Sequence, residues 1–214
     1  MIDNYTNTLL QINLTSSQIE DQIRNYPMEF SQIRNMRIEG HTNAPLFLYS
    51  FYSFVLNESI IPTQTQYWEH YINRAKEWLD QNGCPNSSLR LSALQARAYR
   101  AYPSFVRDIH FSKLLVESKK FQEVFYNETL DAIEGIDIIV VKNNKQYCIR
   151  LHVKTSRSAE WKKKKDNRHD YGDLNEIIVS MDFDKAKKCG EFFLYSTDDI
   201  VKIESYITKK ERAI

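Results

Sequence analysis

Apolar residues recur at helical spacing through most of the first hundred positions. Residues 16–25 open with a capping-box pattern, and residues 63–81 place aromatic and aliphatic side chains every three or four positions before an Asn-Gly pair. Residues 45–56 are rich in Tyr and Phe, which predicts a buried aromatic helix. Residues 87–99 predict a further helix that ends before Pro103, because proline disfavours helix continuation. The pattern therefore predicts an all-helical region over residues 1–100.

From residue 104 the pattern changes to one helix followed by strands. Residues 104–118 predict an amphipathic helix, and residues 136–141 and 146–153 are rich in β-branched residues. A basic helical segment at 159–168, strands at 175–183 and 191–196 and a closing helix from residue 198 follow. We expect an α/β fold, with a mixed four- to five-stranded sheet flanked by helices in residues 101–214. The preceding helical region would serve recognition or oligomerisation.

The first two strands predict a hairpin whose faces differ in chemistry. Asn143 and Asn144 tolerate positive φ and form the predicted two-residue tip. Residues paired across strands share a face, and counting back from the tip gathers four polar side chains on one face: Asp137, Arg150, His152 and Lys154. Gly135, opposite His152, leaves room for an ion or a phosphate oxygen. The other face is apolar, with Ile136, Ile138, Val140, Ile149, Leu151 and Val153. This arrangement predicts a convergent charged site.

Composition narrows the class of protein. The 214 residues are 42% hydrophobic, which is enough to build a core, and no apolar run reaches the roughly 20 residues of a membrane span. Residues 1–14 lack the pattern of a signal peptide, and the three cysteines are far apart without metal-ligand spacing. We therefore expect a cytoplasmic protein with no membrane partner. Five glycines and the absence of the GxSxG and HExxH motifs disfavour nucleotide-loop, α/β-hydrolase and zincin activities.

Charge is unevenly distributed although the net charge is only +1. Residues 1–60 carry six acids and three arginines, whereas residues 142–170 carry ten bases and three acids. A basic segment of this kind is typical of proteins that contact a phosphate backbone, and a solvated helix face is the alternative for the lysine run alone. The candidate nucleic-acid-binding residues are Arg150, Arg157, Lys162, Lys163, Lys164, Lys165 and Arg168.

The acid, the hairpin and the lysine together resemble a known family. The stretch GIDIIVV is similar to the second motif of the PD-(D/E)XK nuclease superfamily, and LHVKT occupies the place of its third motif. The superfamily includes restriction endonucleases, repair nucleases and transposon end-cleaving enzymes. Its restriction-endonuclease-like core, a helix followed by a mixed four-stranded sheet flanked by helices, resembles the element order predicted for residues 104–196. Residues 1–100 resemble no family.

The resemblance implies roles for individual residues. Asp137 would bind a divalent metal, Mg²⁺ or Mn²⁺, and Lys154 would position or help deprotonate the attacking water. An upstream helix in this family often supplies a further acid, and Glu117 is our choice, with Glu123, Glu128 and Asp131 as alternatives. His152 departs from the pattern, which usually has Glu, Asp or Gln. A histidine suits softer metals better than magnesium, so we expect tolerance of manganese or cobalt, or a degenerate site.

The resulting hypothesis is a metal-dependent endonuclease that hydrolyses DNA, from restriction, phage defence or a mobile element. The alternative is a catalytically degenerate nuclease-fold protein that binds nucleic acid or serves as an assembly subunit. RNA as the substrate and a homodimer as the assembly stay open. Asp137 has a structural alternative as well, a buried ion pair with Arg150. We interpret His70 and His110 as packed or surface residues of helices, and His169 as a solvated loop residue.

Overall fold

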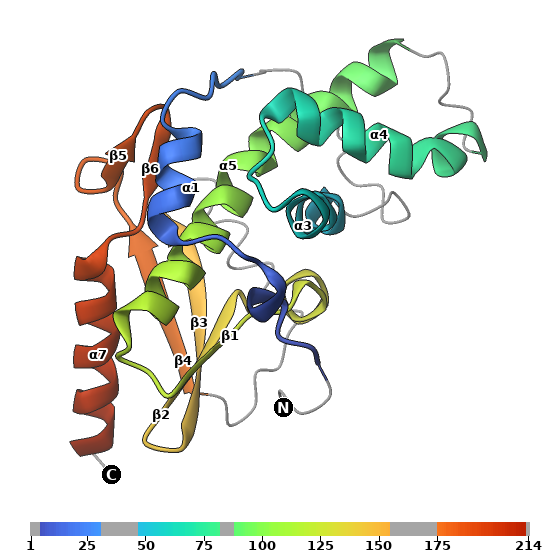
Figure 1. The fold of residues 1–214 in the computed structure, drawn as a ribbon. Helices are drawn as coiled ribbons and strands as arrows, with labels where there is room; N and C mark the ends of the chain where they lie inside the picture. Colours follow the sequence, from blue (N-terminus) through green and yellow to red (C-terminus); the bar gives the residue numbers. More distant parts are fainter. Residues whose placement is uncertain (1–4, 31–46, 82–87, 155–174, 213–214) are drawn as a thin grey trace.

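The computed structural model describes residues 5–30, 47–81, 88–154 and 175–212, which form an α/β protein (Figure 1). Its helices and strands follow in the order α1 (Ser16–Ile23), α3 (Phe47–Glu58), α4 (Gln64–Gln81), α5 (Ser88–Ser118), β1 (Glu123–Phe125), β2 (Ile138–Lys142), β3 (Lys145–Val153), β4 (Asn175–Met181), β5 (Lys187–Cys189), β6 (Phe192–Leu194) and α7 (Thr197–Arg212). A 3₁₀ turn lies at Thr8–Gln11, and a π-helical turn lies at Leu130–Glu134. In the described ranges, no helix is long and apolar enough to cross a membrane.

The helices of the N-terminal region form where the hydrophobic spacing predicts them. α1 begins after Thr15, which makes reciprocal side-chain and backbone hydrogen bonds with Gln18 in a capping box. α3 and α4 bury their aromatic faces against each other, and the rings of Phe51 and Tyr67 meet edge to face with centroids 6.0 Å apart. The aromatic stripe is therefore core, as predicted.

α5 is one continuous helix of 31 residues with Pro103 inside it. The prediction of two helices that meet at this proline was wrong. Pro103 has no N–H to donate to the carbonyl four residues earlier, which belongs to Tyr99. The buried side chain of Gln64 on α4 replaces that donor, because its Nε2 lies 3.3 Å from Tyr99 O. The helix therefore passes through residue 100, and the division predicted at that position falls within α5.

Four strands form a mixed sheet in the order β1-β2-β3-β4, with β3 and β4 parallel and the other two pairs antiparallel. The predicted hairpin is confirmed, since Lys142 pairs with Lys145. Asn143 and Asn144 have φ of 52° and 58°, as a type I′ turn requires. β1 and β5 were not predicted, because three residues are too few to show an alternating pattern.

The sheet has a large core on one face and a small one on the other. α1, α5 and α7 pack with Ile138, Ile149 and neighbouring residues on the first face. The opposite face carries a smaller cluster that consists of Phe125, Leu130, Ile136, Ile139 and Cys148. Ile136 and Ile138 therefore lie on different faces, contrary to the prediction. The reason is that β2 begins to pair only at Ile138, so the two-residue alternation does not extend further back.

β5 and β6 form a separate two-stranded hairpin beside α1 (Figure 1). Gly190 in its turn has φ +56°, and a Cβ at this position would lie 2.2 Å from Arg24 O at the end of α1. Only glycine meets both requirements. The predicted closing helix is confirmed as α7, which is fastened to the sheet by Lys142 Nζ, 2.8 Å from Glu204 Oε1.

Candidate active site

Asp137 is held by backbone contacts at the start of β2. Gly135 adopts the left-handed conformation (φ 68°, ψ 24°) that ends the preceding π-helical turn and directs the chain into the strand. Two residues later the Asp137 carboxylate accepts a hydrogen bond from Leu151 N, with Oδ2 2.5 Å away. The regular β2–β3 pairing stops at Ile138 and Ile149. The Asp137 side chain therefore accepts the hydrogen bond of a β3 backbone N–H that has no partner in β2.

The half-buried Asp137 lines a hollow of about 230 Å³ on the α5 side of the sheet. Its polar lining residues are Ser104, Arg107, Asp108, Asp131, Asp137 and Tyr195. The hollow therefore collects three carboxylates, from α5, from the π-helical turn and from the start of β2. Asp137 was predicted to share a face with Arg150, but it shares the hollow with Leu151 and Val153, because it precedes the first paired residue of the strand.

Buried tyrosines support two sides of this hollow. Tyr126 is fully buried, stacks on Tyr52 with ring centroids 4.7 Å apart, and donates its hydroxyl to Asp131 Oδ2 at 3.1 Å. Burial, reinforced by the nearby Tyr52 and Asp131, raises the pKa of Tyr126 well above its usual value. Its hydroxyl therefore stays protonated and keeps donating to Asp131.

Tyr195 supports the other side. Its hydroxyl donates to the backbone carbonyl of His152 at 3.3 Å, which links the end of β6 to β3. Burial raises the pKa of Tyr195, and the negative charges of Asp108 and Asp137 raise it further, while Arg107 lowers it. The side chains that shift the pKa of Tyr195 are thus the ones that line the hollow with it.

Lys154 follows β3 directly, and its exposed side chain lines a different hollow. Its backbone N donates to Met181 O at 2.9 Å and extends the pairing with β4. This second hollow, of about 430 Å³, has polar lining residues that include Lys154, Asp182, Lys185, Ser196, Asp199 and Lys202. The two hollows adjoin along the chain, since Val153 and Tyr195 line the first while Lys154 and Ser196 line the second. Asp137 and Lys154 thus lie at neighbouring hollows rather than in the single pocket that was predicted.

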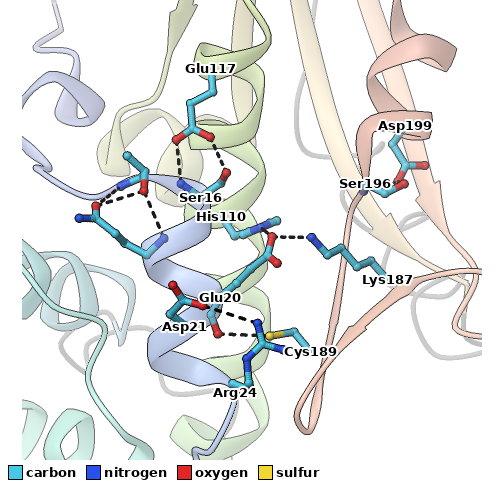
Figure 2. A network of polar contacts seen from close by, with 12 residues as sticks. Ser16, Glu20, Asp21, Arg24, His110, Glu117, Lys187, Cys189, Ser196 and Asp199 are labelled. Atoms are coloured by element: carbon cyan, nitrogen blue, oxygen red, sulfur yellow. Dashed lines mark hydrogen bonds and ion pairs between the residues drawn. The ribbon is translucent and has the colours of Figure 1, made fainter.

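Glu117 does not join Asp137. Its Oε1 accepts a hydrogen bond from Ser16 N at 2.7 Å, and its Oε2 accepts one from Ser16 Oγ, so it fixes the start of α1 (Figure 2). Asp108, nine residues earlier in α5, is the acid of this helix that lines the hollow. Nine residues are about two and a half turns, which places the two side chains on opposite sides of the helix and roughly 13 Å apart along it.

The three alternative acids lie in different places. Glu123 is exposed at the start of β1, and Glu128 accepts a hydrogen bond from Thr8 Oγ1. Asp131 alone of the three lines the hollow with Asp137. Sequence reasoning missed Asp108. The helical period of 3.6 residues was the signal that could have found it, because this period places Asp108 and Glu117 on opposite sides of α5.

The remaining predicted site residues lie elsewhere. Arg150 is buried and forms an ion pair with Glu176, with Nη1 and Oε1 2.5 Å apart, so it is held inside the β3–β4 pair. His152 is half-buried beside Ser180 in the parallel register, and its side chain lines neither hollow. The other basic candidates fall outside the described residues: Arg157, Lys162, Lys163, Lys164, Lys165 and Arg168.

The helical histidines have structural surroundings, as we interpreted them. His110 is fully buried in α5 and its Nε2 lies 2.8 Å from Glu20 Oε1, which also binds Lys187 Nζ at 2.6 Å (Figure 2). This network joins α1, α5 and the β5–β6 hairpin. His70 meets the ring of Phe54 edge to face, with centroids 5.5 Å apart. His169 lies outside the described ranges.

The donor set at the hollow is suited to a hard divalent ion. Over the described part of the chain, no group of three or more His, Cys, Asp or Glu side chains is arranged to hold a metal. Magnesium, however, is usually held by one or two carboxylates, with waters and substrate phosphates completing the shell. Asp137 and Asp108 have the ligand chemistry of that kind of site, and both line one hollow.

Comparisons of the chain with protein-family models, with curated proteins and with solved structures found no match.

Proposed function

We propose that the protein is a metal-dependent nuclease that hydrolyses DNA phosphodiester bonds, with Asp137 as its central carboxylate. The observation that carries this proposal is the fixed Asp137 carboxylate, hydrogen-bonded to Leu151 N at 2.5 Å, in a hollow that Asp108 and Asp131 also line. The resemblance in GIDIIVV and LHVKT supports it, as does the order of a long helix followed by a mixed four-stranded sheet.

The size of the hollow favours one group of an extended substrate. At about 230 Å³ it is smaller than the roughly 300 Å³ at which pockets for whole small-molecule ligands begin. A phosphodiester with one ion is a suitable occupant, while the rest of the polymer would lie outside. Lys154, at the adjoining hollow, would then meet the phosphate that neighbours the scissile one.

The proposed mechanism assigns separate tasks to the acids. Asp137 and Asp108 would hold the ion, which when bound supplies Lewis-acid polarisation of the phosphoryl oxygen and a more acidic water. The hydrogen bond from Leu151 N to Asp137 Oδ2 holds this carboxylate in its place at the hollow. Tyr126 fixes one oxygen of Asp131, which would accept a proton from a water in the hollow.

The test is cleavage of supercoiled plasmid in magnesium, manganese and cobalt. Asp137→Asn and Asp108→Asn preserve shape and should lower the cleavage rate by about 100-fold or more, because the charged donor is lost. Glu117→Gln is the matched control on α5, and we expect it to cleave like the wild type at temperatures where it is folded. A wild-type cleavage rate for Asp137→Asn would refute the assignment.

A second candidate function is a nuclease-fold protein that binds nucleic acid without cutting it. Two observations favour it: Asp137 and Lys154 line separate hollows, and His152 stands where the resembling family usually has an acid. Under this proposal the wild type binds DNA but shows no cleavage in any of the three metals at enzyme excess. Lys154→Ala would then weaken binding and reduce its dependence on salt.

A further inference from the structure

Arg107 is the cation that lines the Asp137 hollow within the described residues. It lies in the middle of α5 beside Val106 and close to Ile109, and both of these side chains are fully buried. The backbone of Arg107 is therefore fixed by the core, while its half-buried side chain reaches the hollow. Lys154, the lysine that the family resemblance assigns to the site, lines the adjoining hollow instead.

The guanidinium of Arg107 has hydrogen-bonding capacity that the protein does not use. A guanidinium carries five N–H donors, and in the described part of the chain the Arg107 side chain makes no hydrogen bond and no ion pair. Other arginines do: Arg150 pairs with Glu176, and Arg74 Nη1 donates to Ser53 Oγ at 2.6 Å. A half-buried guanidinium whose N–H donors have no acceptor destabilises the fold, which indicates that this side chain has a role other than structural.

The surroundings indicate what Arg107 faces. Burial lowers the pKa of Arg107, and the negative charge of the adjacent Asp108 opposes that shift. Asp108 and the neutral hydroxyl of Tyr195 line the same hollow as Arg107. Arginine stays charged in proteins even when burial lowers its pKa. The hollow thus presents a desolvated fork of donors next to carboxylates that suit a cation.

We infer that Arg107 binds a non-bridging oxygen of the substrate phosphate in this hollow, and that it is the phosphate-binding cation of the site in place of Lys154. The inference rests on the proposed function, since a phosphodiester is the occupant proposed there. A guanidinium fork matches two oxygens of a phosphate, and the bidentate contact is stronger than one to a neutral acceptor. Arg107 and an ion held by Asp137 and Asp108 would both offset the negative charge of the phosphate.

The experiment compares Arg107→Met and Arg107→Lys in the full chain, with Arg74→Met as the control on α4. Arg107→Met should change the melting temperature little, because no hydrogen bond or ion pair is lost, and should lower kcat for plasmid cleavage by about 100-fold. Arg107→Lys keeps the charge without the fork and should lose a smaller factor. Inorganic phosphate should raise the melting temperature of the wild type and of Arg74→Met, but not that of Arg107→Met.

The outcomes separate this inference from the proposed function. If the wild type cleaves DNA and Arg107→Met cleaves equally well, the inference is refuted and the nuclease proposal stands. A lowered melting temperature for Arg107→Met, with an unchanged response to phosphate, would likewise assign Arg107 a purely structural role. If the wild type cleaves nothing, the nuclease proposal fails, and the phosphate response alone decides whether Arg107 binds the anion.

Discussion

The contact between Gln64 and the α5 backbone allows a quantitative test of how Pro103 is tolerated. Gln64 is buried, and its amide makes three hydrogen bonds: Nε2 to Tyr99 O at 3.3 Å and to Glu29 O at 3.2 Å, and Oε1 from Glu29 N at 2.7 Å. Gln64→Leu removes all three at nearly constant volume. At about 1 kcal/mol each, partly offset by the added apolar burial, we expect a loss of about 2 kcal/mol in the free energy of unfolding.

Pro103→Ala isolates the Tyr99 part of that loss. Alanine restores the N–H that Pro103 lacks, so Tyr99 O regains a partner within α5. The cost of Gln64→Leu should therefore be about 1 kcal/mol smaller in the Pro103→Ala background than in the wild type. Gln81→Leu, at the exposed end of the same helix α4, should change stability by less than about 0.5 kcal/mol.

The assay is guanidinium unfolding at equilibrium, followed by circular dichroism and by tryptophan fluorescence, with free energies compared where the two transitions coincide. Equal costs of Gln64→Leu in both backgrounds, to within about 0.3 kcal/mol, would refute the claim that Gln64 replaces the missing donor. A loss for Gln81→Leu as large as that for Gln64→Leu would show that the effect is not specific to the buried amide.

Three further predictions concern the contacts between α1, α5 and the β5–β6 hairpin. Burial lowers the pKa of His110 from 6.5 despite its hydrogen bond with Glu20, so the unfolded chain takes up the proton more readily and stability should fall as the pH drops below 6.5. His110→Gln should lose this dependence of stability on pH when the urea midpoints are compared across the pH range. An unchanged dependence would mean that other groups cause it. Gly190→Ala should cost at least about 2 kcal/mol, because its Cβ would lie 2.2 Å from Arg24 O, and a melting temperature equal to the wild type's would contradict this contact. Glu117→Gln should lower the free energy of unfolding by about 1 kcal/mol through weaker hydrogen bonds to the start of α1; the same denaturant assay checks it, and no change would mean that this anchor is dispensable.

Local pattern was enough to predict the elements that depend on neighbouring residues. The Asn143–Asn144 turn was predicted because two residues with positive φ in succession require side chains that tolerate them. Once the tip was known, the register of β2 and β3 followed by counting. The helices α3 and α4 were predicted for a similar reason, since each places its aromatic residues on one side.

Site geometry depended on contacts that the local pattern does not contain. Asp137 was placed by extending the strand alternation one residue too far, past the point where β2 begins to pair. Glu117 was chosen for its position near the end of a helix, but the direction of that helix relative to the sheet decides that Asp108 lines the hollow. The continuity of α5 depends on Gln64, which is 39 residues away from Pro103 in the sequence. Each of these outcomes is set by tertiary packing.

The unbroken course of α5 limits how this protein can be dissected experimentally. The same helix carries Tyr99 and Tyr102 into the aromatic core of the helical region and, about one and a half turns after Tyr102, presents Arg107 and Asp108 to the hollow. A fragment that starts at residue 101 would begin in mid-helix and would expose the buried side of Tyr102. Truncations and fusions intended to isolate the candidate catalytic groups should therefore keep α3 and α4 together with α5, because Phe51 and Tyr67 cover Tyr102.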